Sequence, residues 1–221
     1  MSIRAVLFDF DGVIADTENV HVAAWERTFA AMGWDVPPEV CARAAEEDDR
    51  LFLKSVFVAK GIKDGDLTGW LHRKQVLTVE MLSAFPRVYP GVKDLVEGLA
   101  GRVTMAVVSG TWRENVVTVL RAAGLQSAFA KVIAKEDVER PKPDPSAYRL
   151  ALAALGVSGD QAVALEDSPS GLASARGAGV HVMAVGHRRH DPAWSGDVPF
   201  LPDLRSPDLA SRIIEYRVRP G

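Results

Sequence analysis

Two carboxylates come directly after a short apolar segment near the start of the chain. The segment Arg4–Phe8 is followed by Asp9 and Asp11, two positions apart, and then by Gly12. Open parallel sheets bind ligands just beyond the carboxyl ends of their strands, so we expect both side chains to lie at a binding edge. A buried carboxylate is costly unless it is paired, hydrogen-bonded or bound to a cation. The alternative is that the two aspartates only stabilise the turn.

A second pair of carboxylates, Glu166 and Asp167, follows another apolar segment, Val163–Leu165. If Asp11 and Asp167 lie at neighbouring strand ends, their mutual repulsion raises their pKa values unless a cation is present. A hard divalent ion removes that repulsion, and Mg²⁺ characteristically binds one or two carboxylates together with phosphate oxygens. The alternative is an ordinary helix N-cap, with Asp or Ser placed before Pro169.

Two smaller motifs could complete an anion site. Ser109, Gly110 and Thr111 follow the apolar segment Val103–Val108, and a hydroxyl with exposed amides at a helix start can hold an anion. Lys142 lies between two prolines, which restrict the backbone that carries it. Their alternatives are a turn with a cap and a surface lysine, respectively.

The elements that must position these residues alternate between strand and helix. Short apolar segments without strict polar alternation predict five parallel strands, at Arg4–Phe8, Val103–Val108, Lys131–Ala134, Gln161–Leu165 and Val180–Val185. Helical patterns at Arg113–Ala123, Pro145–Leu155 and Ser170–Ala178 are each followed by a glycine, which is a C-terminal stop signal. We therefore predict an α/β protein with a doubly wound, Rossmann-like parallel sheet.

One stretch lacks this alternation. Residues 16–86 show helical periodicity without a convincing strand, whereas residues 1–15 and 87–221 carry the α/β pattern. We expect a helical cap domain inserted after the first strand, with links near 13–16 and 84–90 that let it move as a lid. A closing helix is expected at Arg205–Tyr216.

Composition narrows the class of protein. The 221 residues are 48% hydrophobic and 25% charged, as in soluble globular proteins, and the net charge of −3 gives no basic footprint for nucleic acid. A single cysteine, Cys41, is compatible with a reducing compartment, and neither a signal peptide nor a membrane span is apparent. We expect a cytoplasmic protein without membrane or nucleic-acid partners, as a monomer or weak dimer.

The order of the motifs resembles a known family. Asp-x-Asp-Gly, then Ser-Gly, Lys-Pro and Glu-Asp-Ser look like the four motifs of the haloacid dehalogenase superfamily, over Ala5–Ala184. The segments Asp9–Thr17, with His21 and Trp25, and Leu165–Gly179 most resemble its β-phosphoglucomutase-like phosphatases and mutases.

The resemblance implies a phosphatase for a small phosphorylated metabolite. Asp9 would attack phosphorus and form an aspartyl-phosphate, and Asp11 would protonate the leaving alkoxide and then activate water. The implied Mg²⁺ ligands are Asp9, the Asp11 carbonyl and Asp167, with Glu166 acting through water. Ser109 and Lys142 would bind the phosphoryl oxygens, and the implied substrate site includes Gly12, Gly110, Thr111, His21, Glu47 and Lys74.

The inserted helices leave more alternatives open. His21 could equally be an exposed histidine, Trp25 a core residue, and Lys74 part of a solvated helix face. In the acidic loop 46–49, Glu47 lies near the place where related mutases carry an arginine for a second phosphate. This substitution argues against a mutase, although the loop could also be a solvated helix start.

The basic segment 187–190 could be taken for a metal site because it contains two histidines, but a solvated loop is the interpretation that we favour. The alternative functions are a sugar-phosphate mutase and a non-catalytic protein that binds phosphorylated metabolites.

Overall fold

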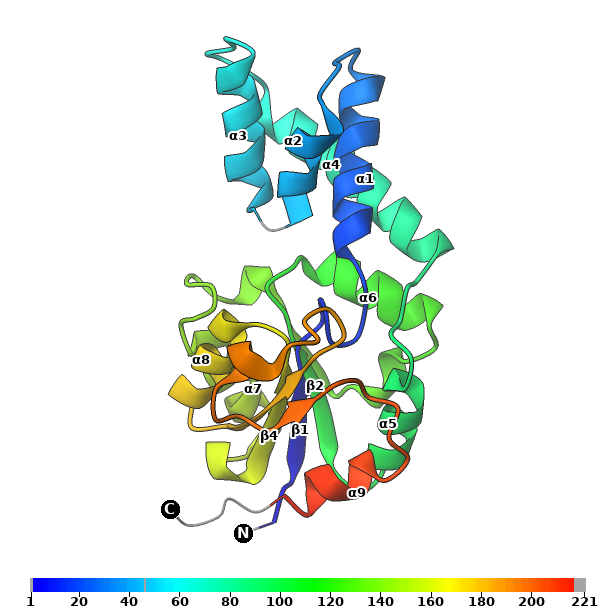
Figure 1. Cartoon of the computed structure of the whole chain (residues 1–221), viewed down its shortest axis with the longest axis vertical. Helices are drawn as coiled ribbons and strands as arrows, with labels where there is room; N and C mark the ends of the chain where they lie inside the picture. Colours follow the sequence, from blue (N-terminus) through cyan, green and yellow to red (C-terminus); the bar gives the residue numbers. More distant parts are fainter. Residues whose placement is uncertain (1, 46, 217–221) are drawn as a thin grey trace. The chain divides into compact units, whose positions relative to one another are not determined.

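The computed structural model describes residues 2–45 and 47–216, which divide into two compact units (Figure 1). The core unit consists of the described residues of 1–16 and 87–221, and the helical unit consists of those of 17–86.

A six-stranded sheet with parallel neighbours forms the centre of the core unit, in the order β3-β2-β1-β4-β5-β6. The strands are β1 (Ala5–Phe8), β2 (Thr104–Val108), β3 (Lys131–Ile133), β4 (Ala162–Glu166), β5 (His181–Val185) and β6 (Phe200–Leu201). Five of them start and end within one residue of the predicted segments, and the predicted α/β class is confirmed. The sixth has only two residues between Pro199 and Pro202, too few for a recognisable apolar pattern.

Three helices, which come after β2, β3 and β4 along the chain, lie where the glycine signals predicted. The core unit contains α5 (Val92–Leu99), α6 (Arg113–Ala122), α7 (Ser146–Leu155), α8 (Pro169–Gly177) and α9 (Leu209–Ile214), with short 3-10 turns η2 (Gln126–Ala128), η3 (Lys135–Asp137), η4 (Gly159–Gln161) and η5 (Pro192–Ser195). Gly156, for example, ends α7 at a φ of 64°, in the left-handed region that glycine enters without strain.

The predicted closing helix is wrong at its start. It was expected from Arg205, but α9 begins only at Leu209. The carboxylate of Asp203 accepts a hydrogen bond from the backbone N–H of Arg205 at 2.8 Å, which forms a local polar turn. Pro207 also disfavours a helical backbone at the residue before it, so the helix starts after both.

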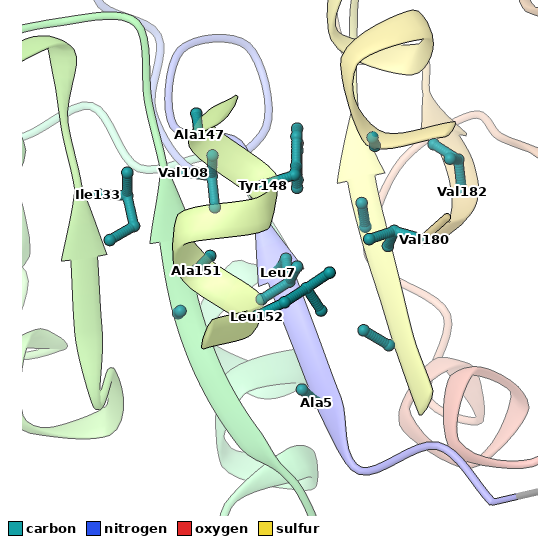
Figure 2. Packing of buried hydrophobic residues seen from close by; sticks show 14 of the residues in the cluster. Ala5, Leu7, Val108, Ile133, Ala147, Tyr148, Ala151, Leu152, Val180 and Val182 are labelled. Atoms are coloured by element: carbon teal, nitrogen blue, oxygen red, sulfur yellow. The ribbon is translucent and has the colours of Figure 1, made fainter. Parts of the chain in front are cut away.

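Side chains alternate between the two faces of the sheet. Ala5 and Leu7 of β1 pack into the same buried cluster as Tyr148 and Leu152 of α7 (Figure 2). Residues at even positions of β1 point to the opposite face, where the ring of Phe8 meets that of Phe129 edge-on at 5.5 Å. Strand β1 is therefore covered on both faces, as its continuous apolar sequence requires.

The strand order reverses at β1, which lies between β2 and β4. Such a switch point is where open α/β sheets bind ligands, at the carboxyl ends of the strands. The residues that follow β1, β2 and β4 therefore meet at one edge of the sheet, and these are the residues with chemistry-bearing side chains.

The helical unit contains α1 (Glu18–Ala31), α2 (Pro38–Cys41), η1 (Ala42–Ala45), α3 (Asp49–Ala59) and α4 (Leu67–Ala84). Its apolar core is largely aromatic and includes Trp25, Phe29, Phe52 and Trp70. The indole of Trp25 stacks on the ring of Phe29, with ring centroids 5.2 Å apart. Trp25 is therefore a core residue, which was one of its two interpretations. None of the described helices of the chain combines the length and apolar character needed to cross a membrane.

Candidate active site

The turn after β1 presents two aspartates at the edge of the sheet. The backbone N–H of Asp9 donates to the carbonyl of Leu165 at 2.9 Å, which ties this residue to β4, and its side chain is buried. Beyond it, the N–H groups of Ile14 and Ala15 both donate to the carbonyl of Phe10, closing a tight turn around Asp11.

Gly12 is required in this turn for two reasons. Its φ of 83° lies in the left-handed region, and a Cβ atom there would come within 1.9 Å of the Asp167 Oδ2 atom. The substrate-site role of Gly12 stays a prediction, and what the structure shows is that the residue makes room for the Asp167 carboxylate.

Lys142 lies at the centre of the candidate site. Its Nζ atom donates to Asp9 Oδ1 at 2.7 Å, to Glu166 Oε1 at 2.7 Å and to the Val108 carbonyl at 2.9 Å. These contacts use all three N–H donors of the ammonium and connect the ends of β1, β2 and β4. Burial alone would lower the pKa of Lys142, but the carboxylates of Asp9 and Glu166 outweigh it and raise that pKa. The surface-lysine alternative is therefore wrong.

Glu166 is fully buried at the end of β4. Its Oε1 atom accepts hydrogen bonds from Lys142 and from the hydroxyl of Tyr148, the latter at 2.6 Å. Its Oε2 atom has no hydrogen-bond partner among the described residues. Burial, followed by the charge of Asp9, raises the pKa of this carboxyl to about 7. A buried carboxylate oxygen in this state is suited to a cation or a water held by one.

Asp167 brings a third carboxylate to the same place. One oxygen each of Asp9, Glu166 and Asp167 lie within 4.8 Å of one another. Burial, and then the charges of Asp9 and Glu166, raise the pKa of Asp167 to about 8. The N-cap of α8 is instead Ser168, whose hydroxyl accepts from the Gly171 N–H at 3.1 Å. The structure therefore gives the capping role to Ser168 and leaves the two carboxylates in the cluster.

This buried cluster is suitable for a hard cation. All three side chains offer carboxylate oxygens, the donors that Mg²⁺ and Ca²⁺ prefer, whereas Zn²⁺ sites usually contain nitrogen or sulfur. The unpartnered Oε2 atom of Glu166 and the raised pKa values both indicate excess negative charge, which a cation would offset.

Ser109 follows β2 and is buried beside this edge. Its backbone N–H donates to the Ile133 carbonyl at 2.8 Å, and its hydroxyl accepts from the Thr111 N–H at 3.0 Å. A Cβ atom on Gly110 would meet nothing within 4 Å, so the backbone of this turn is open on that side. The motif thus lies at a strand end as expected, and Ser109 forms the local turn of the alternative interpretation without capping the next helix.

In the helical unit, His21 and Lys74 belong to a buried polar network. The Lys74 ammonium contacts His21 Nδ1 at 2.7 Å and donates to Asp49 Oδ2 at 2.7 Å, and Asp49 Oδ1 accepts from the Trp25 indole at 2.8 Å. Lys74 is only 1% exposed, so the solvated-face alternative is wrong for it. Because Nδ1 accepts from the ammonium, the neutral ring carries its proton on Nε2.

The acidic loop is a helix start in the structure. The Asp48 carboxylate accepts from the N–H groups of Arg50 and Leu51 and caps α3. Glu47 is half-buried and forms an ion pair with the exposed Arg43 at 2.7 Å, one helical turn earlier. Glu46 lies outside the described residues.

Sequence reasoning missed three polar residues of these networks. Tyr148 was read only as part of a helical pattern, although a tyrosine on a buried helix face needs a partner for its hydroxyl. Asp49 was read as a solvated residue of the acidic loop. Arg188 was assigned to a solvated loop, yet its guanidinium lies 3.4 Å from Asp167 Oδ2. For Arg188 no local signal was available, because the contact joins residues after different strands.

Comparison with known proteins identifies the class. The family model of the haloacid dehalogenase-like hydrolases matches residues 6–185, and the chain belongs to this family. It is 31% identical to the protein CbbY of Rhodobacter capsulatus, with 96% of each chain covered. It is 29% identical to a phosphorylated carbohydrates phosphatase of Thermotoga maritima, covering 86% of this chain and 88% of the relative.

A solved structure agrees with these relatives. The crystal structure of a CbbY variant from Rhodobacter sphaeroides in complex with xylulose-1,5-bisphosphate has a TM-score of 0.75 and 30% identity, covering 92% of this chain and 95% of that one. The predicted family is confirmed, as is the predicted class of enzyme, a phosphoric monoester hydrolase.

Because Gly171 lies against Glu166, we predict that any side chain at position 171 destabilises the fold. A Cβ atom there would lie 1.8 Å from Glu166 Oε2, so Gly171→Ala must displace the buried carboxylate. We expect urea denaturation to show a loss of about 1–3 kcal/mol in the free energy of unfolding, despite the higher helix propensity of alanine. Gly110→Ala, at a site with open space, serves as the control and should change stability by less than about 0.5 kcal/mol. Equal stability of the two variants would contradict this assignment.

The His21 network predicts a loss of stability in acid. Burial, and then the Lys74 ammonium, lower the pKa of His21 to about 4, whereas its value in an unfolded chain is about 6.5. Between these values the unfolded chain binds a proton that the folded chain does not, so stability is complete above pH 6.5 and falls as the pH drops toward 4. Urea denaturation at pH 7.5 and 4.5 should show this fall, with His21 contributing up to about 3 kcal/mol of it.

His21→Gln should reduce that pH dependence, because glutamine does not titrate. His72→Gln, which changes an exposed histidine of α4, should retain the full dependence. Identical pH profiles for the two variants would show that His21 is not held neutral by the network.

Proposed function

We propose that this chain is a magnesium-dependent phosphatase that hydrolyses a small phosphorylated metabolite through an aspartyl-phosphate on Asp9. The observation that carries the proposal is the bridge by Lys142 between Asp9 and Glu166, within a buried cluster of three carboxylates. This arrangement combines a nucleophile, a fixed positive charge and a set of cation ligands at the switch point of the sheet.

The proposed metal ligands are the carboxylates of Asp9 and Asp167 and the main-chain carbonyl of Asp11, with Glu166 acting through a water molecule. Their oxygen donors suit Mg²⁺, which requires few protein ligands and keeps several waters. When bound, the ion would supply Lewis-acid stabilisation of the phosphoryl oxygens and offset the negative charge of the carboxylates.

The proposed reaction proceeds in two displacements. A carboxylate oxygen of Asp9 attacks phosphorus, the bond from phosphorus to the ester oxygen breaks, and the leaving alkoxide takes a proton from Asp11. The Asp11 carboxylate then removes a proton from water, which attacks the aspartyl-phosphate and releases inorganic phosphate and Asp9. Lys142, by exchanging one of its three present contacts, and Ser109 would hold phosphoryl oxygens during both displacements, because positioning and electrostatics dominate phosphoryl transfer.

The helical unit is proposed to act as a cap that selects the substrate, with His21 contacting the substrate and the buried Lys74 acting through its contact with His21. Hydrolysis is favoured over a mutase reaction because the exposed Arg43 is already paired with Glu47. A mutase must hold a second phosphate after the first transfer, and a carboxylate beside the arginine weakens that binding. The names of the relatives support phosphorylated sugars as the substrate class.

We also propose that the protein works in the cytoplasm as a monomer or weak dimer, without nucleic-acid or membrane partners. Its net charge of −3 and its single, buried cysteine support this setting.

The function is tested by the release of phosphate from p-nitrophenyl phosphate and from a panel of sugar mono- and bisphosphates. We expect turnover with Mg²⁺ and none with a chelator. Asp9→Asn should abolish turnover, and Asp11→Asn should lower kcat by about 10²–10⁴-fold while keeping metal binding. Asp64→Asn, an exposed change in the helical unit, is the matched control and should leave activity unchanged.

Phosphorus NMR separates the enzyme alternatives, because a phosphatase yields inorganic phosphate whereas a mutase yields an isomer of the sugar phosphate. Retained activity in Asp11→Asn would contradict its role in proton transfer. A lack of metal-dependent turnover, together with no trapping by beryllium fluoride, would instead favour a non-catalytic binding protein.

A further inference from the structure

The basic segment 187–190, which follows β5, is fixed against the core unit. The ring of His187 stacks on Tyr89, with ring centroids 4.2 Å apart and planes 2° from parallel. The N–H of Gly186 donates to the Leu201 carbonyl at 2.8 Å, and the indole of Trp194 donates to the Arg189 carbonyl at 3.3 Å. The segment is therefore held on both sides by contacts within the core unit.

Arg188 is the member of this segment that reaches the carboxylate cluster. Its Nη1 atom lies 3.4 Å from Asp167 Oδ2, and its side chain is 24% exposed. Its Cδ atom lies 3.1 Å from the position that a Cβ atom of Gly12 would occupy, so the stem of the arginine rests on the turn after β1. Its neighbour Arg189 is exposed.

A count of charges explains why a second cation belongs here. When ionised, Asp9, Asp11, Glu166 and Asp167 carry four negative charges, and Lys142 and Arg188 carry two positive charges, which leaves a balance of −2. Lys142 contacts Asp9 and Glu166, whereas Arg188 contacts Asp167. Arg188 also feels the charges of Asp11, Asp16 and Asp9, and its 3.4 Å contact is with a proposed metal ligand, Asp167.

We propose that Arg188 pairs with the Asp167 carboxylate in the metal-free enzyme and competes with the divalent cation for it. The inference rests on the proposed function, because it assumes that Asp167 binds the metal. A unit positive charge beside a ligand repels an incoming divalent ion, and the guanidinium contacts one of the two carboxylate oxygens of Asp167. Arg188 therefore sets the metal affinity below the value that the carboxylates alone would give.

The position of Asp167 Oδ2 distinguishes competition with the metal from a simple packing role of Arg188. The guanidinium meets the Oδ2 atom, which is the oxygen that lies against Gly12. That backbone contact keeps Asp167 close to its place when the arginine charge is removed. Loss of the charge should thus act on metal binding more than on the position of the ligand.

The test is a calorimetric titration of Mg²⁺ into the full-length, metal-free protein at one pH and low ionic strength. Arg188→Gln removes the charge, and Arg188→Met removes it while keeping an apolar stem on the Gly12 turn. We expect both variants to bind Mg²⁺ about tenfold more tightly than the unmodified protein. Arg188→Lys, which keeps the charge, should restore an affinity near the original.

Arg189→Gln is the matched control, because it removes the same charge from the adjacent exposed position, and its affinity should stay within about twofold. The rise in melting temperature on adding Mg²⁺ gives a second readout and should be larger for Arg188→Gln and Arg188→Met than for Arg189→Gln.

Unchanged or weaker Mg²⁺ binding in both charge-removing variants would overturn the competition. An equal gain in Arg189→Gln would also overturn it, by showing only a long-range effect of net charge. Failure of the proposed function is distinguishable, because the unmodified protein would then bind no Mg²⁺ and every variant would behave alike.

Discussion

The ammonium of Lys142 is the interaction on which the rest of the core site depends. It lies among a strand-end carbonyl and two carboxylates, and these three groups come from three different strands. Without it, Asp9 and Glu166 would face each other with uncompensated charge in a buried environment. The parallel sheet brings the strand ends together, and the positive charge of Lys142 reduces the repulsion between the carboxylates that meet there.

The same site also depends on two glycines, because they carry no side chain. Gly12 and Gly171 lie against Asp167 and Glu166, respectively, at distances that leave no space for a methyl group. Each glycine allows a carboxylate to pack directly on backbone, where solvent is excluded and its charge is felt by neighbouring groups. A side chain at either position would therefore both clash with the carboxylate and move its charge.

The sequence predicted what depends on local pattern. The apolar segments, the glycine stops and the carboxylates at strand ends located five strands, the main helices and the residues Asp9, Lys142, Glu166 and Asp167. The short strand β6 and the late start of α9 were missed because paired prolines and one local aspartate turn decide them.

The contacts of Arg188 and Asp49 could not be predicted for a different reason. Each lies in a run of charged residues, which is typical of a solvated surface, and each partner is far away in the sequence. Only the packed fold decides that Asp49 meets Lys74 rather than water. Periodicity reports which face a residue occupies, but it does not report which distant charge will be opposite.

The distribution of buried charge between the two units has a consequence for how such a protein can diversify. Asp9, Lys142 and Glu166 contact one another within the core unit, and Asp49, Lys74 and His21 do so within the helical unit. Each of these two lysines thus has its ion-pair partners within its own unit. An inserted segment with this property can be exchanged between homologous genes, or can accumulate substitutions, while the reaction chemistry is inherited unchanged.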